Sequence, residues 1–263
     1  MVNAIKQRFL AIVLLDIVGS TAFVQKYGAL KSAKWFQYHD RLTRSLCYKH
    51  QGREIDRSDG FLLSFDEIED AINFALAYQR GVPKKTKLHS RIGIHWGCVI
   101  EVQQEEKFVD AGAKRVELEG LAKNIAARTM SIAKGGQILL TKHSIDVLGH
   151  KKHAFLPREA RCVCIGMYRF KGVKAAQILY AIGEDIDSLQ PPAGDNKVKR
   201  LGGPKYIKKR ARDRLLRDWF FWFYYRIGIA FLFYFVYLIF ENEARRKFFG
   251  VDAVFNSLLW FWR

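Results

Sequence analysis

Apolar and polar residues along the chain alternate in patterns that predict a series of strands and helices. Residues 9–17 form an almost continuous apolar run, which is typical of a strand buried on both faces. Residues 30–49 carry apolar side chains at helical spacing, and Gly52 follows them. The same patterns predict helices at 22–27, 66–78, 121–132 and 141–148, strands at 53–56, 61–65, 89–96, 98–102 and 137–140, and three short strands between 153 and 180.

The order of these elements predicts an α+β fold. Gly97 separates the predicted strands 89–96 and 98–102, and we expect the chain to turn back there. The order is then β-α-α-β-β-α-β-β-α-β-α-β, without an internal repeat. It favours a central sheet that is covered by helices.

Composition changes after this domain. Residues 183–203 contain Pro191-Pro192 and Gly202-Gly203, which predict a linker. We therefore expect a folded domain over residues 1–182, a basic linker over 183–217 and a membrane anchor over 218–263.

The anchor follows from the distribution of charge. The net charge is +18, and residues 197–217 hold ten Lys or Arg residues and a single acid, Asp213. An apolar stretch follows at 219–240, which as a helix would span roughly 33 Å and could cross a hydrocarbon core of about 30 Å. This sequence favours a positive cytoplasmic flank before a membrane helix over a nucleic-acid-binding tail, so we expect no nucleic-acid partner.

A second apolar segment, 248–262, is short for a span and predicts an interfacial or re-entrant segment. The N-terminal apolar run is too short for a secretory signal. The four cysteines lack CxxC spacing, which favours a reducing compartment. We expect a membrane protein, in a bacterial inner membrane, whose folded domain is cytoplasmic.

Two predicted strands each deliver one carboxylate to a turn. Asp16 ends the apolar run, and Asp59 lies in the turn of a predicted hairpin. Magnesium prefers a few hard oxygen ligands beside phosphate oxygens, so this pair predicts a divalent-cation site for a nucleoside triphosphate. The alternatives are a helix-capping role for Asp16 and a turn role for Asp59.

Six segments in register make residues 8–182 similar to the class III nucleotidyl cyclase catalytic domain, the adenylate and guanylate cyclase family. They are Leu15-Asp16-Ile17-Val18-Gly19-Ser20-Thr21, Asp59-Gly60-Phe61-Leu62, Arg91-Ile92-Gly93-Ile94-His95-Trp96-Gly97, Gly120 through Asn124-Ile125-Ala126-Ala127-Arg128, Gly135-Gly136-Gln137-Ile138-Leu139-Leu140 and Phe170-Lys171-Gly172. The resemblance implies a ferredoxin-like α+β domain with a mainly antiparallel central sheet. It also implies that a nucleoside triphosphate is converted to a 3′,5′-cyclic nucleotide and pyrophosphate.

The resemblance assigns roles to residues at a site shared by two subunits of a homodimer. Asp16, Ile17 and Asp59 match the metal positions, for two Mg²⁺ or Mn²⁺ ions per active site. Ile17, Val18, Gly19, Ser20 and Thr21 match the turn whose N–H groups bind phosphate. Asn124 and Arg128 match the pair that orients the ribose and stabilises the transition state, and Lys171 matches the lysine that binds the triphosphate.

The base-reading positions depart from the adenylate cyclase pattern. The hairpin before Asp59 is one residue short, and Ser58 replaces the usual glycine. Asp56 (with Ile55 as the alternative) and Glu117 then occupy the two base positions. An ionised carboxylate only accepts hydrogen bonds, which argues against adenine and leaves guanine, uracil or cytosine open. Asp56 would otherwise pair with Arg53 or Arg57 and read no base.

Two other functions stay open. One is a pyrimidine cyclase that makes cyclic UMP or cyclic CMP, similar to the cyclases of bacterial antiphage signalling. The other is a degenerate cyclase-homology domain that dimerises and binds nucleotide without turnover, which the short hairpin and the missing glycine keep open.

Overall fold

The computed structural model describes residues 5–58, 60–149 and 156–241. The chain divides into two compact units, residues 1–207 and 208–263. Asp59, residues 150–155 and the predicted segment 248–262 lie outside the described residues.

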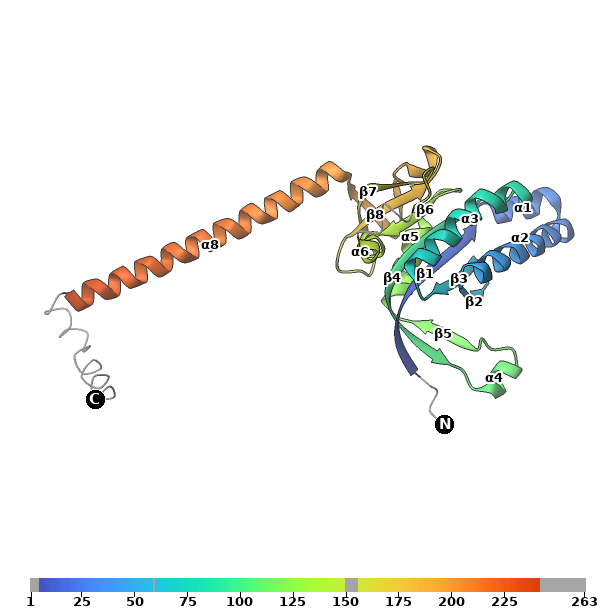
Figure 1. Cartoon of the computed structure of the whole chain (residues 1–263), viewed down its shortest axis with the longest axis horizontal. Coiled ribbons are helices and arrows are strands. Elements are labelled where there is room, and N and C mark those ends of the chain that lie inside the picture. The colour runs from blue at the N-terminus through green and yellow to red at the C-terminus, as the bar shows by residue number, and fades with distance from the viewer. Residues whose placement is uncertain (1–4, 59, 150–155, 242–263) are drawn as a thin grey trace. The chain divides into compact units, whose positions relative to one another are not determined.

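The first unit is built on one large sheet (Figure 1). Neighbouring strands follow the order β2-β3-β1-β4-β6-β8-β7-β10-β9, and β5 pairs with β4. Of the strand pairs in the described residues, only β4–β6 is parallel. The strands are β1 (Ile5–Ile17), β2 (Arg53–Arg57), β3 (Gly60–Phe65), β4 (Ser90–Gln103), β5 (Val116–Glu119), β6 (Ile138–Thr141), β7 (Arg161–Phe170), β8 (Gln177–Gly183), β9 (Gly194–Asp195) and β10 (Val198–Gly202).

Helices cover both faces of this sheet, which confirms the predicted α+β class with a mainly antiparallel sheet. They are α1 (Ser20–Tyr27), α2 (Ala29–Lys49), α3 (Ile68–Thr86), α4 (Glu106–Asp110), α5 (Leu121–Ser131) and α6 (Lys142–Leu148), with a short 3-10 helix, η2 (Asp187–Leu189), after β8. Figure 1 shows β4 and β5 extending as an arm with α4 at its tip.

Strand β1 is buried on both faces, as its apolar run predicts. Leu10 and Ile12 pack in one cluster with Ala122 and Ala126 of α5. Ala11, Val13 and Leu15 point to the other face and join the cluster around α3. Alternate side chains of a strand point to opposite faces, so β1 holds a helix against each side of the sheet.

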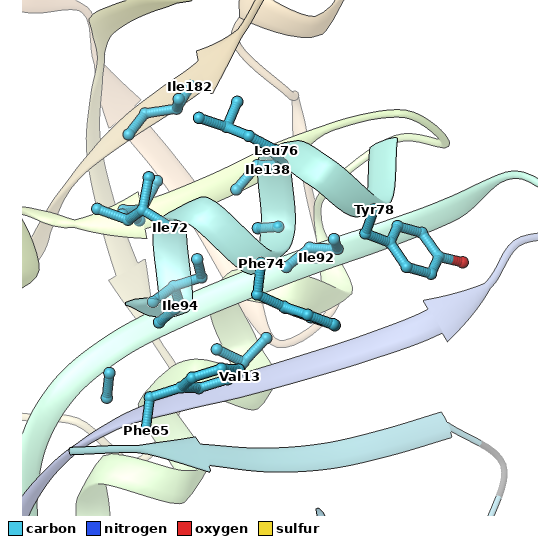
Figure 2. Close-up of a cluster of buried hydrophobic side chains, with 14 of the residues drawn as sticks. Val13, Phe65, Ile72, Phe74, Leu76, Tyr78, Ile92, Ile94, Ile138 and Ile182 are labelled. Atoms are coloured by element: carbon cyan, nitrogen blue, oxygen red, sulfur yellow. The ribbon is translucent and has the colours of Figure 1, made fainter. Parts of the chain in front are cut away.

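The core on the α3 face is large and aromatic. Phe74 and Tyr78 of α3 are fully buried over the sheet, with Phe65 of β3 and Ile92 and Ile94 of β4 beneath them (Figure 2). Such burial contributes about 1.5–3 kcal/mol for each large apolar side chain. This core fixes β1, β3 and β4 as a rigid base.

Two glycines on β4 allow α5 to approach the opposite face. A Cβ at Gly93 would lie 2.7 Å from the carbonyl oxygen of Ala126, and one at Gly97 would lie 2.8 Å from the Cβ of Ala122. Any side chain at either position would push the helix outward. The two glycines therefore seat α5 directly on β4.

Gly97 also explains one wrong prediction. We expected the chain to turn there, but β4 is one continuous strand in which Gly97 pairs with Leu10 of β1. The glycine serves close helix packing instead of a turn. Helix α3 likewise continues beyond the predicted residue 78, through Pro83 to Thr86.

The segment 183–203 differs from the predicted linker. It contains η2 and the β9–β10 hairpin, and β10 pairs with β7 in antiparallel register. Between 156 and 183 the structure has two strands, β7 and β8. The short elements α4 and β5 were not predicted, because their polar residues carry no clear period.

The second unit is described by one helix, α8 (Pro204–Glu241), whose first residues belong to the first unit. The predicted basic linker therefore continues as helix into the apolar stretch. By length and composition, residues 204–238 could cross a membrane. The large apolar side chains between Leu215 and Tyr237 are exposed, as they would be in a lipid-facing helix.

Candidate active site

Asp16 is the penultimate residue of β1, between two ladder partners. It pairs with Gly60 of β3 on one side and with Arg91 of β4 on the other. Gly60 is required at this point, because a Cβ there would collide with the carbonyl oxygen of Leu15. The predicted metal residue Asp59 lies outside the described residues, but its neighbour Gly60 is directly opposite Asp16 in the sheet.

A guanidinium group holds the Asp16 carboxylate. Arg91 donates to Asp16 Oδ2 from Nε at 3.0 Å and from Nη2 at 2.7 Å, and its Nη1 donates to the carbonyl of Ser131 at 2.8 Å. The Asp16 side chain keeps 22% of its surface exposed. The carboxylate is therefore oriented by a cation and still open to solvent.

The turn after β1 has the geometry expected for phosphate binding only in part. Gly19 adopts a left-handed conformation with φ of 73°, which lets the chain enter α1 directly. The N–H of Val18 donates to the carbonyl of His89, so it is already used. The N–H groups of Ser20 and Thr21, in the first turn of α1, have no acceptor within the helix.

Two clefts adjoin at Ser58. One has a volume of about 410 Å³ and is lined by Asp16, Asp56, Ser58, Lys123 and Met130, among others. The other has a volume of about 390 Å³ and is lined by Ile17, Ser20, Thr21, Arg57 and Ser58, among others. Asp16 and the start of α1 thus open to solvent on the two sides of the hairpin turn.

A buried polar chain supports that turn. Arg57 donates to Asp40 at 3.0 Å and also to the carbonyl of Ser58. His39 lies 3.1 Å from Asp40 Oδ1 and 2.6 Å from the hydroxyl of Tyr78. Burial raises the pKa of Asp40, but hydrogen bonds and charges from His39 and Arg57 outweigh it and hold this pKa below its usual range. The ionised Asp40 therefore anchors Arg57.

Asp56 has a different partner from those considered in the sequence. Lys114, which precedes β5, lies 2.6 Å from Asp56 Oδ2, while Arg53 pairs with Glu101 and Arg57 with Asp40. The ladder shifts between Glu54 and Asp56. Ile55, between them, packs against the core under α5, and Asp56 lines the cleft. This favours Asp56 over Ile55 as the cleft-facing residue.

Four other predicted residues do not line this cleft, although Lys123 and Met130 of α5, the helix that carries Asn124 and Arg128, do. Asn124 is exposed on α5, and Arg128 is half-buried in the last turn of the same helix. Glu117 is exposed on β5, and Lys171 is exposed in the turn after β7. The residues described as lining the Asp16 cleft include none of these four. The predicted site residues therefore fall into two groups. The first group, Asp16 and Asp56, lines this cleft, and the second group does not; its members are Asn124, Arg128, Glu117 and Lys171.

The described lining of the cleft offers oxygen donors at Asp16, Asp56 and Ser58, and no His or Cys. Within residues 5–58, 60–149 and 156–241, no group of three or more His, Cys, Asp or Glu side chains could hold a metal ion. Magnesium is commonly held by one or two carboxylates together with phosphate oxygens. A partly exposed carboxylate at Asp16, opposite Gly60 in the sheet, fits that mode of binding.

Two charged residues near the site had no assigned role in the sequence. Arg91 is part of a quoted motif, and its place opposite Asp16 became apparent only from the strand register. Lys114 lies in a segment with no periodic pattern, so nothing in the sequence indicated its contact with Asp56.

The comparisons with known proteins agree with this architecture. The family described as the adenylate and guanylate cyclase catalytic domain matches residues 2–184. No curated protein matches the chain.

Solved structures share the fold. The adenylyl cyclase CyaB of P. aeruginosa is 15% identical, with a TM-score of 0.58 over 71% of this chain and 99% of that one. An adenylate cyclase of Trypanosoma brucei is 18% identical, with a TM-score of 0.55 over 74% and 94%. The guanylate cyclase domain of RhGC from Catenaria anguillulae, solved in complex with GTP, is 15% identical, with a TM-score of 0.54 over 68% and 98%. At these identities the likeness establishes the fold.

Proposed function

Because the chain belongs to the adenylate and guanylate cyclase catalytic domain family, we propose that it converts a nucleoside triphosphate to a 3′,5′-cyclic nucleotide and pyrophosphate. One observation carries the proposal: Asp16 lies near the end of β1 in an open cleft, directly opposite Gly60, the residue that follows Asp59. That is where a carboxylate pair would meet the triphosphate.

In the proposed reaction, the ribose 3′-oxygen attacks the α-phosphorus. The new bond joins the 3′-oxygen to phosphorus, the bond to the bridging oxygen breaks, and pyrophosphate leaves with the electron pair. The 3′-hydroxyl proton is released to water. Asn124 orients the ribose, and Arg128 neutralises the negative charge that develops on the phosphoryl oxygens.

Other groups bind the rest of the nucleotide. Lys171 contacts the triphosphate, and the free N–H groups at the start of α1 donate to phosphate oxygens. Asp56 and Glu117 contact the base. Lys114, at 2.6 Å from Asp56, adds a donor beside that acceptor. The pair could therefore serve a base with both donors and acceptors on its edge, so the identity of the base stays open.

Asp16, Ile17 and Asp59 would hold two divalent cations, Mg²⁺ or Mn²⁺. When bound, such ions act as Lewis acids that acidify the 3′-hydroxyl and neutralise the triphosphate. Arg91 would keep Asp16 oriented both with and without bound cations, because it binds one carboxylate oxygen and also the carbonyl of Ser131.

The complete site would form between two copies of the chain. The Asp16 cleft of one subunit would face Asn124, Arg128 and Lys171 of the other. This arrangement is supported by the lining of the Asp16 cleft, which does not include Asn124, Arg128 or Lys171 of the same chain.

The helix α8 would attach the enzyme to a membrane, with the catalytic domain on the cytoplasmic side. The basic residues that precede its apolar part support this orientation, since positive flanks are enriched on the cytoplasmic side. In bacteria this would be the inner membrane.

A panel of the four nucleoside triphosphates tests the function. The full chain in detergent or vesicles, supplied with Mn²⁺, should release pyrophosphate and form a cyclic nucleotide identified by mass spectrometry. A product from UTP or CTP would favour the pyrimidine cyclase. Metal-dependent binding of nucleotide without any product would overturn the enzymatic proposal and favour a degenerate module.

A further inference from the structure

The β9–β10 hairpin lies beyond the part of the chain that matches the family. The match ends at residue 184, whereas β9 begins at Gly194 and β10 ends at Gly202. The hairpin nonetheless joins the catalytic sheet, where β10 pairs with β7 from Val198 opposite Phe170 to Gly202 opposite Met167. It contacts α5, the helix that carries Asn124 and Arg128, and the end of β7, which Lys171 follows.

Its first contact is with the end of α5. Asp195 accepts a hydrogen bond from Ser131 Oγ at 2.8 Å through Oδ2, and one from the N–H of Lys197 at 2.7 Å through Oδ1. Ser131 is the last residue of α5, and Arg128 lies in that same last turn. Both carboxylate oxygens are thus fixed at the end of the helical turn that carries Arg128.

This position is unfavourable unless a cation accompanies it. The C-terminus of a helix carries partial negative charge, so a carboxylate placed there is repelled. Burial also raises the pKa of Asp195. The hydrogen bonds from Ser131 and from the N–H groups of Lys197 and Val198, together with the charge of Arg128, nevertheless hold this pKa below its usual range. The carboxylate is therefore ionised, and Arg128 is one of the charges that keep it so.

The second contact is with the turn that carries Lys171. The N–H of Lys171 donates to the carbonyl of Lys197 at 2.8 Å, which extends the β7–β10 ladder past Phe170. Lys197 therefore links Asp195, through its N–H, to Lys171, through its carbonyl. One short hairpin therefore contacts both the end of the helix that carries the predicted catalytic residue Arg128 and the backbone of the predicted substrate-binding residue Lys171.

We propose that the β9–β10 hairpin is a positioning element of the catalytic site, in which Asp195 holds the last turn of α5, and with it Arg128, and Lys197 fixes the Lys171 turn. This inference rests on the proposed cyclase function, because it assigns the hairpin to residues of that site. An arginine held in place before substrate binds loses less freedom when it meets the phosphate. The hairpin also runs into α8 with only Gly203 between them, so the membrane helix is joined directly to the element that orients Arg128.

Removing the charge of Asp195 tests the proposal. Asp195→Asn keeps the shape of the side chain, and Asp187→Asn in η2 removes one charge from the same segment as a matched control. We expect Asp195→Asn to lower kcat by about ten- to hundred-fold, as misplacement of a catalytic group does. The Kd for a nonhydrolysable triphosphate should change less than about threefold, since ground-state binding involves many other contacts. Asp195→Glu should restore part of kcat.

A second readout does not depend on turnover. The ¹⁵Nε resonance of Arg128, assigned in the full chain with an Arg128→Lys variant, should shift in Asp195→Asn and not in Asp187→Asn. An unshifted resonance, or kcat equal to that of the Asp187→Asn control, would overturn the positioning role. If the wild type forms no cyclic product, the proposed function fails, and the resonance still decides whether Asp195 positions Arg128.

Discussion

The two groups of candidate site residues are held in contrasting ways. Asp16 lies near the end of β1, has ladder partners on both sides and is bound by Arg91. Asn124 lies on the exposed surface of α5, Arg128 in the last turn of that helix, and Lys171 in an exposed turn after β7. The first group is fixed by the core, and the second is fixed by local contacts.

This difference suggests a division of labour. A metal-binding carboxylate must be placed within fractions of an ångström, and β1, which is buried on both faces, is packed closely enough to hold one. In the proposed dimer, groups that arrive from a second subunit would need to adjust as the site closes on the nucleotide. Side chains on the outer face of α5 and in the turn after β7, next to the β9–β10 hairpin, would allow that adjustment.

The largest effect should come from neutralising the first group. Asp16→Asn removes the proposed metal ligand and leaves Arg91 without its anion, so we expect turnover to fall about a thousand-fold, or ~4 kcal/mol in the activation barrier. The measurement is pyrophosphate release at saturating Mn²⁺ and nucleotide.

Asp66→Asn is the matched control for that change. Asp66 also pairs with an arginine, Arg8, at 2.8 Å, but at the opposite end of β1, with 64% of its side chain exposed. Its loss should leave turnover within about twofold. Equal losses in both variants would mean that Asp16 acts through stability alone.

Mixing two inactive variants tests whether the two groups come from different subunits. Arg128→Ala alone should lose about a hundred- to thousand-fold in kcat. In a random one-to-one mixture with Asp16→Asn, half of the dimers would be mixed, and each would hold one intact site of two. Activity should then return to about a quarter of the wild-type value.

A mixture that stays inactive, although mixed dimers are detected by mass spectrometry, would place both groups in one subunit. Asp16 and Arg128 would then belong to one site within a single chain.

The sequence predicted features that leave a continuous local pattern, and it missed contacts between residues far apart in the chain. The apolar run of β1 predicted a strand buried on both faces, and the structure confirms it, because a two-sided strand leaves a continuous signal. The contact between Arg91 and Asp16 depends on register across 75 residues, and that of Asp195 with Ser131 spans 64. No local pattern encodes such pairs. Gly97 shows the opposite error, because a glycine for helix packing has the same sequence signal as a turn.

The stability of the sheet around β4, next to Asp16, should depend on pH. His95 of β4 is buried, with Nδ1 2.7 Å from Thr141 Oγ1 of β6, and burial with the nearby charge of His143 lowers its pKa to about 4. The unfolded chain binds that proton near pH 6.5. The free energy of unfolding should therefore fall as pH drops from about 6.5 toward 4, by about 3 kcal/mol in all from this group.

Urea unfolding at several pH values measures this dependence. His95→Gln should flatten it, whereas His89→Gln, at an exposed position, should leave it as in the wild type. An unchanged slope in His95→Gln would assign the acid sensitivity of the core to other groups.

The smallest effect should be on the choice of base. Asp56 and Lys114 are partly exposed, at 24% and 49%, so each hydrogen bond they make to a base is worth about 1 kcal/mol, or about fivefold in discrimination. Asp56→Ala and Lys114→Ala should shift the ratio of cyclic products from an equimolar nucleotide mixture in different directions, since one removes an acceptor and the other a donor. Lys107→Ala, whose ammonium pairs with Glu105 at 2.8 Å on the same arm, is the control. Identical product ratios in all three variants would remove Asp56 from base reading and leave it as the surface anchor of the β4–β5 arm.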